Sequence, residues 1–199
     1  ANKIVDILKT ESNPEGKFLH PMSKQRQHLC FTGGEPLMVT GQLASVGIYE
    51  ELLKQGNLPE SMTFETNGTQ KLKEPFKEWA TGIDQEVFFS CSPKLFTVSG
   101  EESKKAIIPE VVGEYRQVSK AGQLKFVVGS EQRQWDEMDS AIEKFRAEGV
   151  DWPVWVMPVG AREEEQTATA GDVAKLAFQR GYNVAARVHV YLFGNAIGT

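Results

Sequence analysis

The segment best suited to chemistry is Thr32-Gly33-Gly34-Glu35-Pro36, which directly follows a short apolar run typical of a β-strand. Its two glycines let a ligand approach the backbone closely, because neither carries a Cβ atom. Free N–H and C=O groups beside a carboxylate suit a ligand that carries both an ammonium and a carboxylate group. An ordinary strand-to-helix turn would also explain a bare Gly-Gly pair, but the whole pentapeptide at a strand end is far more specific.

Polar side chains recur at every second position near the ends of other predicted strands. The sets that share a face are Glu65 with Asn67, Ser90 with Ser92 and Lys94, and Arg187 with His189, while Lys125 stands alone. Charged groups inside a barrel cost several kcal/mol each unless they are paired or bind a ligand. The pattern therefore favours a ligand cavity bounded by these side chains.

Each of these polar groups also has a structural interpretation. Glu65 and Asn67 could form an Asx-turn after a strand, and Lys94 could be a solvated loop lysine. His189 has no partners at metal-ligand spacing, so a hydrogen-bonded structural histidine is favoured over a metal ligand. The sequence indicates no catalytic side chain and no metal site.

These side chains need elements to position them, and from His28 onward the chain repeats strand, glycine-rich turn and helix. Strands are expected near residues 29–32, 62–65, 87–90, 124–128, 154–157 and 184–193. Helices are expected between them, with apolar faces that include Leu43, Val46, Tyr49 and Leu53 in one helix, and Trp135, Met138, Ile142 and Phe145 in another. This order predicts an α/β fold with a parallel sheet or barrel and functional groups at the strand ends.

Residues 1–27 differ from the rest of the chain. A short apolar cluster from Ile4 to Leu8 could be the end of a helix, and residues 10–27 form a polar, proline-containing loop. No repeat of fixed period and no second domain are evident in the sequence. We therefore expect a remnant helix and loop followed by one α/β domain.

Composition excludes several classes of protein. The chain has 199 residues, 40% of them hydrophobic and 25% charged, with a net charge of −5. These values are average for globular proteins, so disorder, collagen and coiled coil are excluded. A net negative chain is a poor non-specific binder of nucleic acid, and no apolar run is long enough for a membrane helix. We expect a cytoplasmic protein that binds neither nucleic acid nor membrane.

The chain has two cysteines, Cys30 and Cys91. Two thiols cannot build a disulfide framework or a four-thiolate metal site. Both cysteines lie within predicted strands, so we expect them to behave as small buried hydrophobic residues.

The order of the motifs adds a resemblance to a known family. The pentapeptide at 32–36 resembles the Gly-Gly-Glu motif of radical S-adenosylmethionine enzymes. Downstream follow Glu65-Thr66-Asn67-Gly68-Thr69, Ser92-Pro93-Lys94, Lys125-Phe126-Val127, Met157-Pro158, His189, Leu192-Phe193-Gly194-Asn195 and Gly198-Thr199. This ordered set resembles the 7-carboxy-7-deazaguanine synthases of the queuosine pathway. The resemblance spans about residues 28–199 and implies a partial parallel β/α barrel of the radical S-adenosylmethionine type.

The resemblance implies roles for individual residues. Thr32 would contact a pterin substrate, and the last residue, Thr199, would contribute to the substrate pocket. The remaining residues would bind S-adenosylmethionine, namely Gly33, Gly34, Glu35, Ser92, Pro93, Lys94, Met157, Pro158, Val159 and Gly160, the last four at its adenine end. At the position of Met157 the family usually has glutamine, so one polar contact is absent here.

The implied reaction converts 6-carboxy-5,6,7,8-tetrahydropterin to 7-carboxy-7-deazaguanine with loss of ammonia, which is a carbon–nitrogen lyase reaction. A [4Fe–4S] cluster would reduce S-adenosylmethionine, and Mg²⁺ would assist. The family holds its cluster with a Cys-x-x-x-Cys-x-x-Cys loop upstream of the Gly-Gly-Glu strand, but no cysteine precedes Cys30 here. The first barrel strand, the cluster loop and the Mg²⁺ ligand are thus expected to be absent from this chain. We favour a fragment of a longer enzyme over a natural chain that has lost radical chemistry.

Two other functions stay open at this point. A radical enzyme that activates glycyl-radical enzymes would share Gly-Gly-Glu, but it would have no reason to carry the Ser92-Pro93-Lys94 turn. A non-catalytic pterin- or S-adenosylmethionine-binding module is the second alternative. The resemblance also implies a homodimer, and it leaves open whether the product serves transfer RNA or modified DNA bases.

Overall fold

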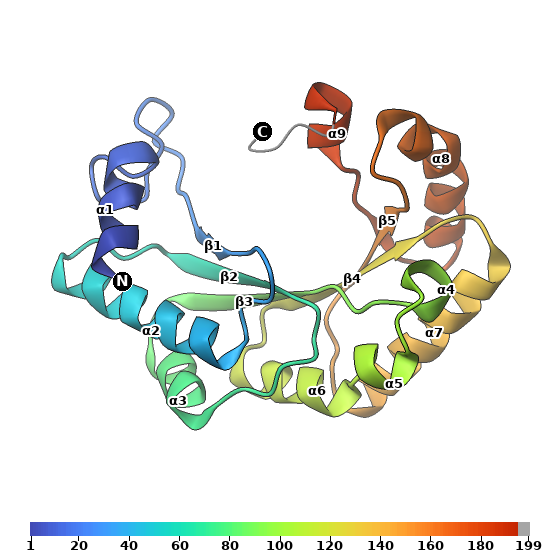
Figure 1. The fold of residues 1–199 in the computed structure, drawn as a ribbon, viewed down its shortest axis with the longest axis horizontal. Coiled ribbons are helices and arrows are strands. Elements are labelled where there is room, and N and C mark those ends of the chain that lie inside the picture. Colours follow the sequence, from blue (N-terminus) through green and yellow to red (C-terminus); the bar gives the residue numbers. More distant parts are fainter. Residues whose placement is uncertain (195–199) are drawn as a thin grey trace. The chain divides into compact units, whose positions relative to one another are not determined.

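The structure is a computed structural model and describes residues 1–194. Its strands are all parallel and follow the sheet order β1-β2-β3-β4-β5-β6, which is also their order in the sequence (Figure 1). The strands are β1 (Leu29–Phe31), β2 (Ser61–Thr66), β3 (Glu86–Cys91), β4 (Gly122–Val128), β5 (Val154–Pro158) and β6 (Asn183–Val184). This sheet confirms the α/β prediction and is consistent with a partial barrel.

Helices separate the strands along the chain, as a parallel sheet requires. They are α1 (Asn2–Glu11), α2 (Val39–Lys54), α3 (Glu74–Gly82), α4 (Phe96–Ser99), α5 (Ser103–Ala106), α6 (Pro109–Val118), α7 (Gln132–Ala147), α8 (Glu163–Gln179) and α9 (Val188–Phe193). None of these described helices is both long enough and apolar enough to span a bilayer.

The described chain divides into two compact units. The first unit contains residues 1–66, 70–90 and 114–122, and the second contains residues 67–69, 91–113 and those from 123 onward. The helix at the start of the chain is present as α1, and a polar loop follows it. The division was not evident in the sequence, because each unit is assembled from separate stretches of the chain.

The core of the first unit is aromatic. Phe64 of β2 lies 5.3 Å from Phe76 and 6.0 Å from Phe89, measured between ring centroids, and Phe89 stacks on Tyr115 at 4.9 Å. The helices α2 and α3 lie along one face of the strands (Figure 1). Phe64 is fully buried, whereas its neighbour Glu65 on the opposite face of β2 is exposed. One face of the strand therefore anchors the fold and the other presents polar groups.

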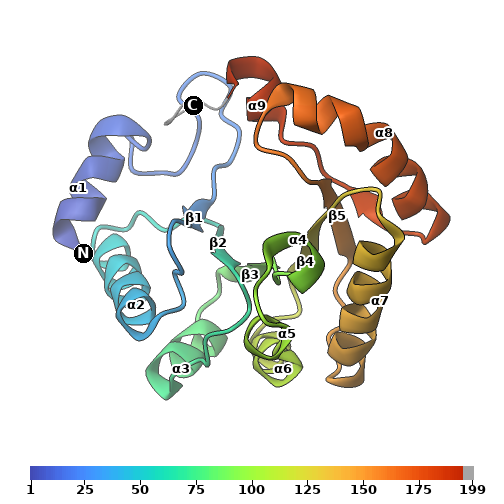
Figure 2. The same cartoon turned by 45° about the vertical axis from the view of Figure 1, so that its right-hand side comes forward.

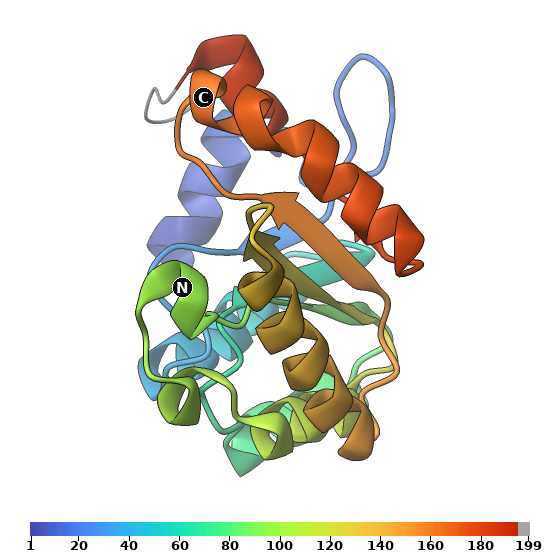
Figure 3. The ribbon, with the colours of Figure 1, turned by 90° about the vertical axis from the view of Figure 1, so that its right-hand side faces the viewer.

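The second unit repeats this alternation. In β4, Leu124, Phe126 and Val128 are fully buried, and the residues between them are half-buried. The predicted apolar face of α7 is confirmed, since Trp135, Met138 and Phe145 are fully buried and Ile142 is nearly so. The helices α7 and α8 lie side by side (Figures 2 and 3), and the guanidinium of Arg180 joins them by donating to Asp139 at 3.1 Å.

The predicted long strand at 184–193 is wrong. The strand β6 ends at Val184, and residues 188–193 form the helix α9. Arg187 precedes this helix and His189 lies in its first turn, so the two do not share a strand face. A short run rich in valine, with one deeply buried residue, Val190, does not distinguish a strand from a helix by its periodicity.

Two smaller predictions are also corrected. Leu43 and Leu53 are 58% and 53% exposed, so they do not form the buried face of α2. That face contains Gln42 instead, which is drawn inward because its amide nitrogen donates to the carbonyl oxygens of Leu37 and Lys71. Cys30 is exposed, because it lies on the less covered face of β1, whereas Cys91 is buried as expected.

Candidate functional site

The turn after β1 has the geometry of a ligand cradle. Gly33 and Gly34 have φ angles of +82° and +55°, in the left-handed region that side chains rarely adopt. A Cβ atom placed on either glycine would meet no other atom within 4 Å. Within the described chain, the peptide groups of these two glycines form no hydrogen bonds. The turn thus offers open space beside N–H and C=O groups that a ligand could use.

The carboxylate of Glu35 fixes this turn from within. Its Oε1 atom accepts a hydrogen bond from the Thr66 hydroxyl at 2.7 Å and another from the Leu37 N–H at 3.0 Å. Thr66 is nearly buried at the end of β2, and Leu37 is fully buried. Hydrogen bonds to a charged acceptor are stronger than neutral ones. Glu35 therefore joins the C-terminal end of the turn to the end of β2.

The backbone of α2 packs closely against the same turn. A Cβ atom on Gly41, in the first turns of α2, would overlap the backbone oxygen of Pro36. Only glycine allows α2 to approach the turn so closely, although the φ angle of Gly41 is ordinary. The sequence analysis did not identify this requirement, because nothing in the sequence marks which part of the chain a helical glycine contacts.

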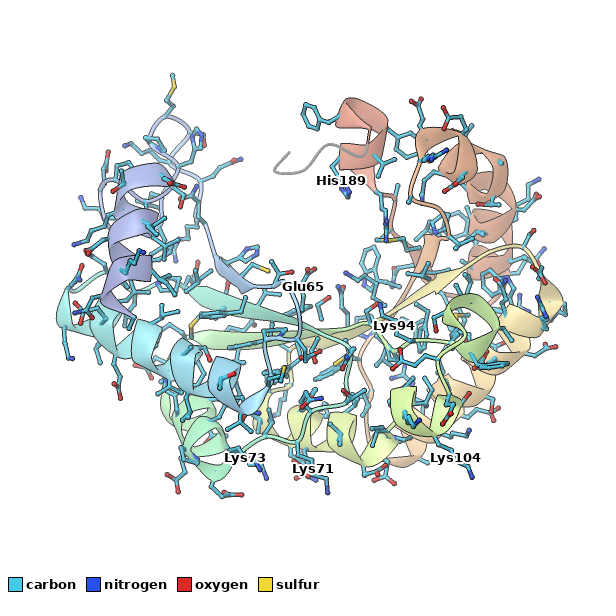
Figure 4. All side chains as sticks on the ribbon, viewed as in Figure 1. Glu65, Lys71, Lys73, Lys94, Lys104 and His189 are labelled. Carbon is cyan, nitrogen blue, oxygen red and sulfur yellow. The ribbon has the colours of Figure 1, made fainter. Side chains whose placement is uncertain are left out.

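The substrate-contact candidate Thr32 lies beside Glu65. The Thr32 hydroxyl donates to Oε2 of Glu65 at 3.0 Å, and Glu65 projects from the open face of β2 (Figure 4). The preceding residue, Phe31, stacks on Phe64 with 4.8 Å between ring centroids, which sets the register of the two strands. The structure therefore brings together two polar residues that lie 33 positions apart in the sequence.

The turn after β3 places Lys94 between two anchors. Pro93 is buried and Leu95 is 2% exposed, whereas the Lys94 side chain is exposed at the turn (Figure 4). Ser92 is half-buried. A solvated lysine and a ligand-binding lysine would both be exposed in this way. The residues on each side of Lys94 are nevertheless buried, so its side chain extends from an anchored part of the backbone.

The third predicted segment, residues 157–160 after β5, is held by the buried side chain of Gln166 in α8. Its amide nitrogen donates to the carbonyl oxygens of Pro158 at 2.9 Å and Gly160 at 2.7 Å. Gln166 is fully buried, and its Oε1 atom has no hydrogen-bond partner among the described residues. The Val159 N–H continues the sheet by donating to the Val128 carbonyl at 2.8 Å. These hydrogen bonds hold the loop against α8 and the end of β4.

Two further contacts shape this loop. Gly160 has a φ angle of +137°, and a Cβ atom there would lie 2.8 Å from Cβ of Glu165. The guanidinium of Arg187 donates from Nε to the Met157 sulfur at 3.4 Å and from Nη1 to the Gly160 carbonyl at 3.5 Å. Arg187 therefore belongs to the second unit's candidate loop and not to a strand face.

The pKa of Glu165 lies below its ordinary value. The backbone N–H groups of Ala161 and Arg162 donate to Oε2 of its carboxylate at 2.7 and 3.2 Å and favour the charged form. The carboxylate is thereby kept ionised at the start of α8, where negative charge is favourable. This contact closes the loop that carries the predicted adenine-side residues.

The start of α7 supports the neighbouring loop after β4. Oε1 of Gln134 accepts the Gly129 N–H at 2.5 Å, and the indole N–H of Trp135 donates to the Gly129 carbonyl at 2.9 Å. The sequence analysis assigned Trp135 to the core alone and did not single out Gln134 or Gln166. The signal that could have identified both residues is a glutamine at a position on the buried face of a helix, where its amide needs hydrogen-bond partners.

The sequence left two interpretations open for Asn67 and for His189, a structural role or a role in a site. Asn67 does form an Asx-turn, because its Oδ1 accepts the Thr69 N–H at 3.0 Å and the Thr69 hydroxyl at 2.7 Å. His189 is exposed in the first turn of α9 (Figure 4). Thr199 lies outside the described residues, so its predicted role in the substrate pocket stays a prediction.

The described residues do not fit an iron–sulfur cluster. Such a cluster is held by several thiolates, whereas this chain has one exposed and one buried cysteine. Among residues 1–194, no three histidine, cysteine, aspartate or glutamate side chains are grouped so that they could hold a metal ion. The open glycine turn, by contrast, fits the methionine part of S-adenosylmethionine, which carries an ammonium and a carboxylate group.

The chain is 28% identical over 186 residues to the 7-carboxy-7-deazaguanine synthase of Rhodopirellula baltica, an alignment that covers 87% of this chain and 64% of the relative. The chain thus spans about 64% of the length of the curated relative that it matches. No family model and no solved structure matches the chain. Similarity over most of the chain supports the resemblance to 7-carboxy-7-deazaguanine synthases that its ordered motifs indicate.

Proposed function

We propose that this chain binds S-adenosylmethionine as part of a radical enzyme of the 7-carboxy-7-deazaguanine synthase type. The observation that carries the proposal is the turn at 32–36, where two left-handed glycines leave both peptide groups and the space beside them open. The similarity to a 7-carboxy-7-deazaguanine synthase supports the choice of this cofactor over other ligands with an ammonium and a carboxylate.

In this proposal the turn binds through its backbone, and its side chains hold it in place. The peptide groups of Gly33 and Gly34 would contact the methionine ammonium and carboxylate. The Glu35 carboxylate already accepts hydrogen bonds from Thr66 and Leu37. We therefore assign Glu35 the task of positioning the two glycines, which refines the family-implied role of direct cofactor contact.

The other proposed contacts rest on the resemblance. Lys94 is an exposed cation on a fixed turn and would pair with an anionic group of the ligand. The loop at 157–160 would line the adenine end, where Gln166 and Arg187 occupy the carbonyls of Pro158 and Gly160. When bound, S-adenosylmethionine supplies radical hydrogen abstraction from the substrate. The protein supplies placement and exclusion of water.

Calorimetric titration of the chain with S-adenosylmethionine tests the proposal. We expect saturable binding by the wild type and at least about tenfold weaker binding by Gly34→Ala, equivalent to about 1.4 kcal/mol. The reason is that the new Cβ would occupy the open space of the cradle and strain the backbone at φ +55°.

The matched control is Gly56→Ala at the end of α2. Gly56 also has a positive φ, +67°, and open space where a Cβ would lie, so the backbone strain is similar. Gly56→Ala should therefore bind as the wild type does. Absence of saturable binding by the wild type, or equal loss in both variants, would overturn the proposal.

The full reaction is proposed on the same basis and needs its own assay. A longer form of the protein that includes a three-cysteine cluster loop, supplied with an iron–sulfur cluster, a reductant, S-adenosylmethionine and 6-carboxy-5,6,7,8-tetrahydropterin, should form 7-carboxy-7-deazaguanine, detectable by mass spectrometry. Thr32 and Glu65, joined by a hydrogen bond of 3.0 Å, are the proposed substrate contacts in the first unit. Cofactor binding without this product would leave the chain as a binding module and reject the lyase reaction.

A homodimer is also proposed from the resemblance. Light scattering at several protein concentrations would measure the mass in solution. A mass of about twice 22.1 kDa supports the dimer, and the mass of one chain at all concentrations rejects it.

A further inference from the structure

The carboxylate of Glu137, in the second turn of α7, accepts four hydrogen bonds from residues outside that helix. Its Oε1 accepts the Phe96 N–H at 2.8 Å and the Ser103 hydroxyl at 3.1 Å. Its Oε2 accepts the Thr97 N–H at 2.9 Å and the Thr97 hydroxyl at 2.6 Å. One carboxylate thus contacts three residues that lie between 34 and 41 positions away in the sequence.

The residues that Glu137 holds directly follow the Ser92-Pro93-Lys94 turn. Phe96 and Thr97 are the first two residues of α4, and their N–H groups have no partner within the helix. Phe96 itself is 55% exposed, so apolar packing of its side chain does not fix this end of α4. Between these residues and Lys94 lies only Leu95, which is buried.

The electrostatics favour a charged carboxylate at this place. Burial acts to raise the pKa of Glu137, but the hydrogen bonds from Thr97, Phe96 and Ser103 outweigh it, and its pKa lies below the ordinary value of 4.5. Glu137 is therefore ionised at neutral pH. An ionised acceptor is what unpaired N–H groups at a helix start bind most strongly.

We propose that Glu137 is a positioning residue for Lys94, because its carboxylate fixes the backbone that follows the Ser92-Pro93-Lys94 turn. This inference rests on the proposed binding of S-adenosylmethionine for its functional part. Glu137 does not contact the ligand in this account. It keeps the backbone of the Lys94 turn ordered before the ligand arrives, so the binding free energy is not spent on ordering the turn.

Glu137→Gln tests the proposal, because glutamine keeps the shape but removes the charge and presents an NH₂ group to N–H donors. Hydrogen exchange followed by mass spectrometry reports on the amides of residues 92–103. We expect their exchange to become about tenfold faster in Glu137→Gln, while exchange in α7 itself changes little. Affinity for S-adenosylmethionine should fall about tenfold at a temperature where the variant is fully folded.

The matched control is Glu143→Gln, an exposed carboxylate on the same helix, and it should behave as the wild type in both measurements. Thr97→Val removes one of the four hydrogen bonds, and it tests the same contact if Glu137→Gln does not fold. It should give an effect in the same direction and smaller.

The two measurements separate the possible failures. Unchanged exchange in residues 92–103 of both Glu137→Gln and Thr97→Val would overturn the proposal. Faster exchange with unchanged affinity would overturn its functional part, since the turn would then not need to be fixed. If the wild type binds no S-adenosylmethionine, the proposed function fails, and the exchange data alone decide whether Glu137 holds the turn.

Discussion

The turn after β1 and the turn after β3 are fixed by two different means. In the first, Glu35 lies within the turn and reaches Leu37, two residues away, as well as Thr66. In the second, the carboxylate comes from Glu137, about forty positions further along the chain. Both carboxylates accept hydrogen bonds from N–H and hydroxyl groups, so the chemistry is the same. They differ in position, because Glu35 lies within the turn that it supports and Glu137 lies in a different helix. The residue that supports the first turn is therefore part of its sequence motif, whereas the residue that supports the second turn cannot be recognised from the sequence of that turn.

The largest effect on stability is expected from a substitution that displaces the first turn at the point where α2 approaches it. Gly41→Ala should lower the free energy of unfolding by about 3 kcal/mol, because the new Cβ overlaps the backbone of Pro36 and the turn must move. Urea unfolding measures the change.

Gly47→Ala is the matched control for that substitution. Gly47 lies in the same helix, and a Cβ there would make only an ordinary contact at 3.8 Å with the side chain of Ala1. It should leave stability unchanged or raise it by up to about 1 kcal/mol, because alanine is the better helix former. Equal losses in both variants would mean that α2 itself, and not its approach to the turn, is sensitive.

A smaller effect is expected when the first turn loses one of its internal bonds. Thr66→Val keeps the side-chain shape but removes the hydroxyl that donates to Glu35, and should cost about 1.5 kcal/mol. Thr63→Val in the same strand is the control, since Thr63 is only half-buried on the open face. If the two variants unfold at the same urea concentration, Glu35 is not anchored through Thr66.

Acid should act on the second turn through Glu137. Its pKa is lowered in the folded protein, so the folded state holds fewer protons than the unfolded state just below pH 4.5. The stability that it contributes is present above pH 4.5 and is lost as the pH falls through the folded pKa. Glu137→Gln should cost about 1 kcal/mol at pH 7 and should flatten the loss of stability below pH 4.5. Parallel stability curves for this variant and wild type would contradict the assignment.

The smallest expected effect concerns the attachment of α7, which must itself be fixed if it is to hold a turn. The Tyr182 hydroxyl donates to Asp139 of α7 at 3.0 Å, and burial, followed by this bond, raises the pKa of Tyr182 to about 12. Tyr182→Phe should cost about 0.5 to 1 kcal/mol at pH 8.

The stability that the Tyr182–Asp139 contact contributes should be lost as the pH rises, whereas the contribution of Glu137 is lost as the pH falls. With a raised folded pKa, the contribution of Tyr182 is fully present below pH 10.0 and is lost as the pH rises towards about 12. Urea unfolding at pH 8 and pH 11 should therefore show a smaller difference between wild type and Tyr182→Phe at the higher pH. An unchanged difference would show that the tyrosine does not titrate with folding.

Much of the fold was predictable from local signals. The strands at 62–65, 87–90 and 124–128 lie within one or two residues of their predicted bounds, because each is a short β-branched or aromatic run that ends at a turn-forming residue. The segment at 184–193 was not predictable, because its valine-rich pattern suits a strand and a helix equally. The buried face of α2 was predicted only in part, since Tyr49 is buried as predicted, whereas Leu43 and Leu53 are exposed. Gln42 is buried in their place and donates to the carbonyl oxygens of Leu37 and Lys71.

The sequence by itself determined the fold class, the glycine turn at 32–36 and the resemblance from which the ligand of this turn is proposed. These depend on contiguous residues whose backbone preferences act locally. Only the tertiary structure decided that Glu35 positions the turn through Thr66, that Gln166 and Arg187 hold the loop at 157–160, and that Glu137 supports the turn of Lys94. Glu35, Arg187 and Glu137 reach partners between 27 and 40 positions away, and Gln166 reaches back from α8 to the loop that precedes it. The type of a polar residue does not reveal which of these partners it will meet.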